Sequence, residues 1–347
     1  MKEVVFAVPG DLATPTGGYT YDRRIIAELP ARGWRARVLD LGDGFPRPTA
    51  QVRATACANL AALPPGRPVV IDGLAFGVIP DAAEALHSNH PLIALVHHPL
   101  ALESGLSSGE AAALRQSVRT ALGCARRVIA TSAATARLLA ADYGVPADRL
   151  MVVQPGTDRG AAQPRRSEDT VSLLAVGAVV PRKGYDVLVA ALARLKTLSW
   201  RLVIAGDCAR NPDAARRLEA DIARFGLADR VTVLGAVSSE RLAALYASAD
   251  LFVLPSRFEG YGMAYAEAIA QGVPVVGTTA GAIPETVPAG AGVLVPPDDV
   301  EALAAVLRRL IESPDERQRL AAGARAMVFP SWREQGALFA RALEGLA

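Results

Sequence analysis

The chain has 347 residues, of which 51% are hydrophobic, and its 37 lysines and arginines nearly balance 35 aspartates and glutamates. At about 150 residues per domain, this length predicts two domains with enough apolar residues for two buried cores. The balanced charge, without a long basic run, argues against nucleic acid as a partner. No segment reaches the roughly 18 uncharged apolar residues of a membrane span, although peripheral membrane contact stays open.

The cysteines indicate the compartment. Cys57, Cys124 and Cys208 lie far apart and match neither a disulfide framework nor a metal site, which favours a reducing cytoplasm. The N-terminus runs directly into the apolar residues 4–8, which are too few and too early for a signal peptide. We therefore expect a cytoplasmic protein, with the inner face of the membrane as a further location left open.

The first half of the chain alternates short apolar strands with helical patterns. Strands are expected at residues 4–8, 35–39, 68–71, 92–96, 127–130 and 151–153, and helices at about 19–31, 50–62, 81–86, 109–123 and 133–143. This alternation predicts a parallel sheet covered by helices on both faces, that is, a doubly wound α/β domain. The pattern breaks at residues 155–167, which we interpret as an interdomain linker.

The second half restarts the same alternation. Strands are expected at residues 172–176, 201–205, 231–234, 251–254, 273–277 and 292–295, and helices at about 184–197, 212–225, 239–247, 263–271, 300–311, 315–327 and 332–346. We therefore predict an N-terminal domain at 1–158, a C-terminal domain at 159–330 and a terminal helix at 331–347.

One stretch in the second half combines two carboxylates with glycines. Glu259 and Glu267 flank the loop that contains Gly260 and Gly262, directly after the apolar residues 251–254. Ligands of open α/β sheets bind at the carboxyl ends of the strands, where this loop is expected. Glycines at the start of a helix also expose N–H groups that favour anions. Two glutamates at this spacing are common on solvated helices, so the strand and loop context carries the prediction.

This stretch resembles the E-x7-E element of retaining glycosyltransferases of family 4, which have the GT-B fold. The GT-B fold has two Rossmann-like, doubly wound domains facing a cleft, and the resemblance covers nearly the whole chain. It implies that Glu259 meets the donor sugar, that Glu267 holds the ribose hydroxyls, and that the C-terminal helix crosses back to the first domain. The loop residues implied in donor binding are Gly260, Tyr261, Gly262 and Met263.

A basic pair lies after another strand, in the segment that begins at Gly177. Arg182 and Lys183 precede a helix at the expected cleft, where their charges would neutralise a diphosphate and the leaving group. Many family members have an arginine directly after the first glycine, where this chain has Ala178, so we transfer that role to Arg182 and Lys183. The alternative is that both are solvated cations at a helix start.

In the first half, Gly17 and Gly18 follow the first strand and resemble the family's glycine-rich loop, which lets backbone approach a phosphate. His97 and His98 end the fourth strand, and adjacent side chains of an extended chain point to opposite sides. The resemblance implies that His97 contacts the donor sugar, while a structural, hydrogen-bonded histidine is the alternative. A metal site would need a third ligand, and nothing in the sequence suggests one.

Weaker candidates complete the set. The resemblance implies that the backbone at Gly235 and Val237 holds the nucleotide base. Glu103, Asp72 and Asp11 are candidates for the acceptor side, although each is also an ordinary polar loop residue.

The resemblance implies a retaining transfer of a sugar from a UDP- or GDP-linked donor to an acceptor hydroxyl, by displacement on one face of the sugar. Because the sequence contains no Asp-x-Asp triplet, we expect no metal and no cofactor. The acceptor is a glycan, a lipid-linked molecule or a small molecule. Three alternatives stay open: a nucleotide-sugar 2-epimerase, a nicotinamide dehydrogenase, which lacks its glycine fingerprint here, and a non-catalytic nucleotide-binding protein.

Overall fold

The computed structural model describes residues 2–103, 105–160 and 170–346. It divides the chain into two compact units, Met1–Gly156 with Pro330–Ala347 and Thr157–Phe329. From the sequence we placed these divisions after residues 158 and 330. The predicted linker lies partly on residues 161–167, which are outside the described residues.

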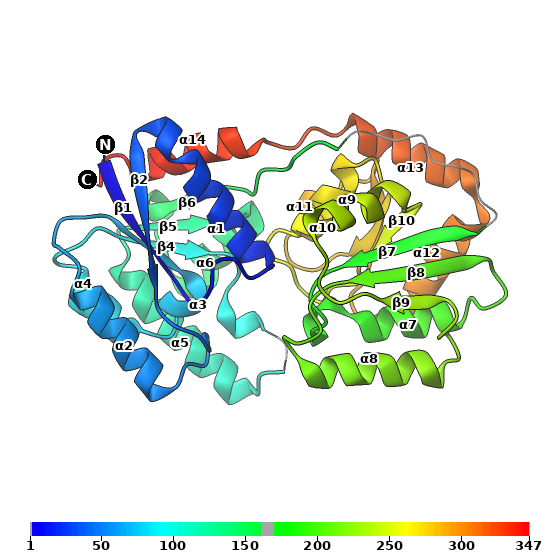
Figure 1. The fold of residues 1–347 in the computed structure, drawn as a ribbon, viewed down its shortest axis with the longest axis horizontal. Helices are drawn as coiled ribbons and strands as arrows, with labels where there is room; N and C mark the ends of the chain where they lie inside the picture. The colour runs from blue at the N-terminus through cyan, green and yellow to red at the C-terminus, as the bar shows by residue number, and fades with distance from the viewer. Residues whose placement is uncertain (1, 104, 161–169, 347) are drawn as a thin grey trace. The chain divides into compact units, whose positions relative to one another are not determined.

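The first unit contains a six-stranded parallel sheet in the order β2-β1-β3-β4-β5-β6. Its strands are β1 (Lys2–Val8), β2 (Trp34–Asp40), β3 (Val69–Asp72), β4 (Leu92–Val96), β5 (Arg127–Ala130) and β6 (Leu150–Val152). Its helices are α1 (Gly17–Glu28), α2 (Ala50–Ala61), α3 (Gly73–Phe76), α4 (Pro80–Leu86), α5 (Ser108–Cys124), α6 (Ala133–Tyr143) and α14 (Trp332–Leu343). Helices α1 and α14 lie on the face opposite α2, α4 and α5 (Figure 1).

The second unit repeats this plan with the strand order β12-β11-β10-β7-β8-β9. Its strands are β7 (Val171–Val176), β8 (Trp200–Ala205), β9 (Val231–Val233), β10 (Leu251–Val253), β11 (Val275–Thr278) and β12 (Gly292–Val295). Its helices are α7 (Tyr185–Ala193), α8 (Pro212–Arg224), α9 (Ser239–Ser248), α10 (Met263–Ala270), α11 (Ile283–Thr286), α12 (Val300–Glu312) and α13 (Pro314–Ala326).

The last helix of the chain belongs to the first unit. Ser331 and Glu334 form a reciprocal capping box at the start of α14, and α14 packs against α1. Phe339 stacks on Phe6 of β1 with ring centroids 5.5 Å apart. The Arg127 guanidinium donates to the Ala342 carbonyl over 2.6 Å. These contacts add a C-terminal helix to a sheet built from the first half of the chain.

Both sheets reverse their order next to the first strand that they contain. In the first unit the reversal lies between β1 and β3, and in the second it lies between β10 and β7. The loops that leave the two central strands diverge to opposite faces at such a point, and this opens a site for ligands at the carboxyl ends. Each unit therefore has one position at which its topology favours binding.

The main differences from the predicted elements concern short helices. Helices α3 and α11 have four residues each, too few to show a helical period in the sequence. The helix predicted at 184–197 begins one residue later, because Pro181–Lys183 form a separate 3₁₀ turn that ends at Gly184.

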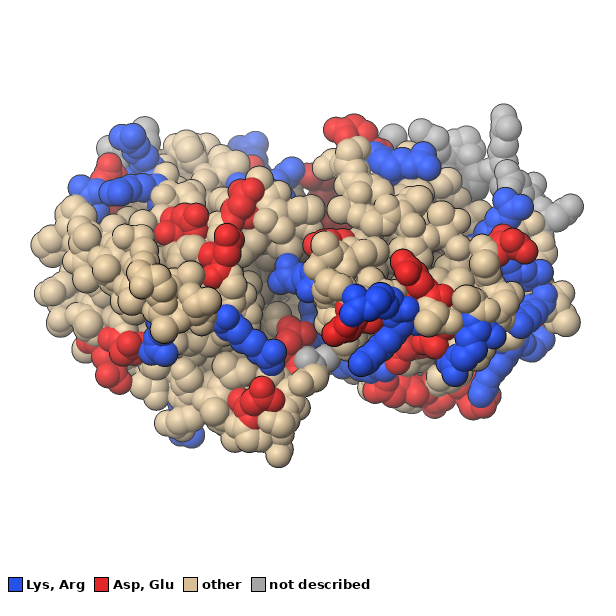
Figure 2. Space-filling model, turned by 60° about the horizontal axis from the view of Figure 1, so that its bottom comes forward, with Lys and Arg blue, Asp and Glu red and all other residues tan. Residues whose placement is uncertain are grey.

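No helix within residues 2–103, 105–160 and 170–346 combines the length and apolar character that crossing a membrane requires. On the face in Figure 2, basic and acidic side chains lie side by side. On α8, Arg224 Nη2 lies 2.8 Å from Asp221 Oδ1.

Candidate functional site

The predicted donor-site residues of the second unit meet because β7 and β10 are neighbours in the sheet. The loop after β7 contains Arg182 and Lys183, and the loop after β10 contains Glu259. The N–H of Arg257 donates to the carbonyl of Arg182 over 2.8 Å and joins the two loops. The topology thus brings together residues that are far apart in the sequence.

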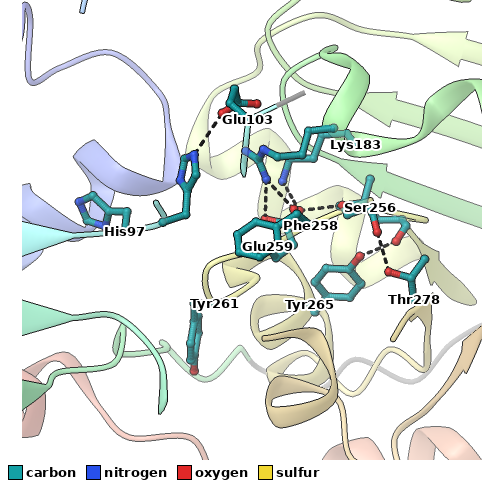
Figure 3. A network of polar contacts seen from close by, with 12 residues as sticks. His97, Glu103, Lys183, Ser256, Phe258, Glu259, Tyr261, Tyr265 and Thr278 are labelled. Carbon is teal, nitrogen blue, oxygen red and sulfur yellow. Dashed lines mark hydrogen bonds and ion pairs between the residues drawn. The ribbon is translucent and has the colours of Figure 1, made fainter. Parts of the chain in front are cut away.

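Glu259 is enclosed by three donors (Figure 3). Lys183 Nζ lies 2.7 Å from Glu259 Oε1, and Ser256 Oγ donates to the same oxygen over 2.7 Å. Arg182 donates to Glu259 Oε2 over 3.2 Å and to the Phe258 carbonyl over 2.8 Å. The Glu259 residue is only 6% exposed, so a buried carboxylate fixes both predicted phosphate-binding cations.

The charges in this cluster decide the ionisation of Glu259. Burial by itself would raise the pKa of Glu259, but the charges of Lys183 and Arg182, with the hydrogen bonds from Lys183 and Ser256, outweigh it and lower the pKa to about 2. Glu259 is therefore an anion at neutral pH. A carboxylate between two cations can hold them in place for a diphosphate and can accept a hydrogen bond from a sugar hydroxyl.

Gly184 lets the two loops approach each other. Its φ of +69° lies in the left-handed region, and a Cβ there would lie 2.1 Å from the Pro255 carbonyl oxygen. A side chain would therefore both strain the backbone and force the β7 and β10 loops apart.

We expect Gly184→Ala to lower the free energy of unfolding by about 3 kcal/mol, because backbone strain and overpacking each cost about 1–3 kcal/mol. Thermal and urea unfolding of Gly184→Ala and of a control variant test this. Gly226→Ala is the matched control: Gly226 has a φ of +62°, but a Cβ there would meet only Lys196 Nζ at 3.6 Å. Equal losses in the two variants would show that the contact with Pro255 is unimportant.

The second glutamate of the element lies on α10. Gly262, with a φ of +92°, precedes this helix, and Glu267 lies one turn beyond its start. Tyr246 of α9 donates its hydroxyl to Glu267 Oε2 over 2.9 Å. Burial raises the pKa of Glu267 to about 7, although the hydrogen bond from Tyr246 opposes this rise. Tyr246 therefore favours the ionised form of the carboxyl predicted to hold ribose.

We expect Tyr246→Phe to weaken UDP or GDP binding at pH 7 about fivefold, because one hydrogen bond is worth about 1 kcal/mol. Without the Tyr246 hydroxyl, the pKa of Glu267 rises further, so the loss of affinity should shrink as the pH is raised to 9. Titration calorimetry at both pH values measures this. Tyr143→Phe is the control, since that buried hydroxyl has no hydrogen-bond partner within the described ranges. An unchanged affinity at pH 7 would remove Tyr246 and Glu267 from the predicted ribose site.

The other donor-side candidates of the second unit follow β9 and β10. Tyr261 is buried, and its carbonyl accepts a hydrogen bond from Thr286 Oγ1 over 2.6 Å, while Gly260 and Met263 flank the same turn. Gly235 follows β9 in the left-handed region, with a φ of +70°, and its carbonyl accepts from the Gly206 N–H over 2.8 Å. Val237 packs partly against the core, so these two positions stay predictions for base binding.

The first unit brings His97 to two buried carboxylates. His97 Nε2 lies 3.2 Å from Asp22 Oδ1 of α1 and 3.5 Å from Asp72 Oδ2 at the end of β3. The sequence did not suggest that these two carboxylates lie next to His97. Imidazole and carboxylate are ligands for divalent metals, and the three ligand atoms lie within 4.8 Å of one another. The absence of a metal in the reaction stays a prediction.

The remaining predicted residues of this unit have local roles. A Cβ at Gly18 would lie 3.3 Å from His97 Cδ2, so the glycine leaves room for the imidazole, while Gly17 is the exposed first residue of α1. Glu103 Oε2 lies 3.1 Å from His98 Nε2. Asp11 is exposed and accepts from the Ala13 N–H over 2.8 Å. Asp72 contacts His97 and caps α3 through the Leu74 N–H, and its role on the acceptor side stays a prediction.

Sequence reasoning missed three residues that the structure adds, namely Asp22, Ser256 and Tyr246. Asp22 follows Gly18 by one helical turn on α1, so it lies on the same side of the helix as the glycine-rich loop. This spacing could have identified Asp22 from the sequence. Ser256 precedes Glu259 at S-x-x-E spacing. Tyr246 lies on another helix, and no local pattern connects it to Glu267.

Two family models match adjoining parts of the chain. The model of glycosyl transferases group 1 matches residues 158–327, and that of glycosyltransferase family 4 matches residues 16–160. The chain belongs to glycosyltransferase family 4. This family 4 chain is 35% identical over 266 residues to MMP alpha-(1->4)-mannosyltransferase of Mycolicibacterium hassiacum, which covers 71% of the chain and 63% of that relative. The chain also matches D-inositol 3-phosphate glycosyltransferases and spans about half of their length.

Solved structures agree on the GT-B fold of this family 4 chain. Sucrose-phosphate synthase from Thermosynechococcus elongatus has a TM-score of 0.82 at 22% identity, with 98% of each chain covered. Anabaena HepE in complex with UDP-glucose has a TM-score of 0.77 at 23% identity, with 97% of this chain and 98% of that chain covered. At these identities the likeness establishes the fold of the family 4 chain.

Proposed function

We propose that this family 4 protein is a retaining glycosyltransferase that moves a sugar from a UDP- or GDP-linked donor to an acceptor hydroxyl. One observation carries the proposal: the buried Glu259 holds Arg182 and Lys183 at the point where the second sheet reverses its strand order. The likeness to a mannosyltransferase and to HepE with UDP-glucose supports the reaction class and the type of donor. The acceptor is a glycan, a lipid-linked molecule or a small molecule.

In the proposed reaction the bond between the anomeric carbon and the β-phosphate oxygen breaks, and the acceptor oxygen bonds to that carbon on the same face. The departing phosphate oxygen takes the proton of the acceptor hydroxyl, so the products are the glycoside and the nucleoside diphosphate. Arg182 and Lys183 stabilise the charge that develops on the phosphate, without a metal or a cofactor. Glu259 accepts a hydrogen bond from the sugar and positions it for attack.

A thermal-shift panel with UDP, GDP, ADP and NAD, each with and without EDTA, tests the proposal first. A ligand present at about 100 times its Kd stabilises a protein by about 2.7 kcal/mol. This corresponds to a rise of several degrees in Tm, at about 2–4 °C per kcal/mol. A rise with UDP or GDP that EDTA does not change is expected. A response to NAD alone, or to none of the four, would contradict the proposal.

A further inference from the structure

Arg257, in the loop after β10, binds both ends of the short segment 181–186, which follows β7. Its guanidinium donates to the Pro181 carbonyl at the start of this segment. At the other end it binds the Asp186 carboxylate in a bidentate manner, with Nη1 3.0 Å from Oδ1 and Nη2 2.7 Å from Oδ2. The Arg257 N–H also donates to the Arg182 carbonyl over 2.8 Å. A single residue therefore holds the whole segment.

Segment 181–186 contains the two cations predicted to bind the donor diphosphate, Arg182 and Lys183. Both belong to a 3₁₀ turn that precedes α7, so their backbone lies between the two points that Arg257 binds. Glu259 binds the side-chain ends of the same cations, at 3.2 Å and 2.7 Å. The backbone and the side chains of the cations are therefore held by two different residues of the β10 loop.

Asp298 orients the guanidinium from a third loop. Arg257 Nε lies 2.7 Å from Asp298 Oδ1, in the loop between β12 and α12. Asp298 has a φ of +61°, in the left-handed region that is uncommon for residues other than glycine. Such backbone conformations persist only where the surrounding structure holds them. The loop thus presents this carboxylate to the guanidinium in an unfavourable conformation.

The contacts of Arg257 depend on the geometry of its guanidinium as well as on its charge. The Arg257 side chain is 27% exposed, and those of Asp186 and Asp298 are 55% and 59% exposed. Exposed ion pairs add little to stability unless the pair is bidentate or several charges form a network, and this group has both features. A lysine has the same charge but cannot form a bidentate pair with one carboxylate while it binds a second one. The arrangement therefore requires an arginine.

We propose that Arg257 is a positioning residue that holds the backbone of Arg182 and Lys183, so that both cations meet the diphosphate of the donor. Asp186 and Asp298 fix its guanidinium. Because these two carboxylates match its charge, Arg257 acts through the cations and not on the phosphate itself. This inference rests on the proposed function for its ligand, whereas the contacts that hold the backbone lie within the second unit alone.

The affinities for UDP and UMP, or for GDP and GMP, test the inference with whichever diphosphate raises the Tm. Only the diphosphate has the second phosphate, so the Kd of the monophosphate divided by that of the diphosphate isolates its contribution. We expect Arg257→Ala to lower this ratio about tenfold. This is less than the roughly 100-fold cost of a 1 Å misplacement, because Glu259 still holds the side-chain ends of the cations. Titration calorimetry measures the ratio, and a loss of stability alone would not change it.

Further variants separate geometry from charge. Arg257→Lys keeps the charge but not the bidentate contact, so most of the loss should remain, and a full recovery of the ratio would overturn the positioning role. Asp186→Asn and Asp298→Asn should lower the ratio in the same direction, and they decide the inference if Arg257→Ala does not fold. Arg224→Ala, which breaks the exposed pair with Asp221 on α8, is the control and should leave the ratio unchanged.

A double-mutant cycle shows whether Arg257 acts through the cations. In the Lys183→Ala background, Arg257→Ala should lower the ratio by a smaller factor than in the wild type, because part of its effect depends on the lysine. Equal factors in the two backgrounds would contradict the inference, as would an unchanged ratio in Arg257→Ala alone.

Amide hydrogen exchange in the ligand-free full chain tests the hold on segment 181–186 without any nucleotide. The amides of residues 182–186 should exchange about tenfold faster in Arg257→Ala, because the contacts at both ends of the segment are lost, and should be unchanged in Arg224→Ala. Unchanged exchange in Arg257→Ala would overturn the inference even if the ratio falls. If no nucleotide raises the Tm of the wild type, the proposed function fails, whereas the exchange rates still decide whether Arg257 holds the segment.

Discussion

Lys183→Ala is expected to lower kcat about 10²–10³-fold, a loss of about 2.7–4 kcal/mol of transition-state stabilisation, the cost typical of removing one oxyanion-stabilising donor. Lys183 lies in the loop after β7, with its Nζ 2.7 Å from Glu259. In the proposed reaction, this contact with Glu259 holds the charge of Lys183 at the position of the departing diphosphate. Steady-state kinetics with the donor found in the thermal panel measure the loss.

Lys196→Ala is the matched control, because Lys196 is an exposed lysine that follows α7 in the same unit. It should keep wild-type turnover. The Tm of Lys183→Ala shows whether the variant is folded. We expect the unit to stay folded, because Glu259 keeps Arg182 and Ser256 as hydrogen-bond partners. Near-normal turnover in Lys183→Ala would remove the lysine from the reaction.

Glu259→Gln is expected to affect both stability and sugar transfer. The pKa of Glu259 falls from 4.5 to about 2 on folding. This difference of about 2.5 units, at 1.36 kcal/mol per unit, gives about 3 kcal/mol of stability at neutral pH. The amide also leaves Arg182 and Lys183 without their buried counter-charge, which is destabilising. The exposed Glu219→Gln on α8 is the control and should be neutral.

The stability that Glu259 contributes should change with pH in one direction only. Because folding lowers the pKa of Glu259, its stabilisation is complete above about pH 4.5 and is lost as the pH falls through about 2. The difference in free energy of unfolding between wild type and Glu259→Gln should therefore shrink between pH 7 and pH 3. A constant difference would mean that the carboxylate charge is not the stabilising feature.

A comparison of nucleotide binding with sugar transfer shows whether Glu259 contacts the sugar or the nucleotide. Glu259→Gln should weaken use of the nucleotide sugar while leaving the Kd of free UDP or GDP largely unchanged. Titration calorimetry with the nucleotide, beside kinetics with the sugar donor, distinguishes the two. An equal loss in both measurements would place Glu259 at the nucleotide instead of the sugar.

Much of the fold could be predicted from the sequence, because buried parallel strands are short runs of apolar, β-branched residues. Each β-rich apolar run between helical patterns, such as residues 4–8 or 251–254, became a strand of one of the two sheets. The short helix α3 could not be predicted, because four residues show no helical period. Asp72 was therefore read as a loop residue, although it caps that helix and contacts His97.

The sequence by itself determined the alternating strands and helices, the family, and the local elements around Glu259, Glu267 and His97. These features depend on periodicity and on residues that are neighbours in the chain. Only the tertiary structure decided the partners: Glu259 with Lys183, Glu267 with Tyr246, and His97 with Asp22 and Asp72. Strand order brings these groups together across long stretches of sequence, and burial then makes their charges depend on one another. The ionisation of Glu259 is thus a property of the folded unit, because the side chain needs its partners to be charged when buried.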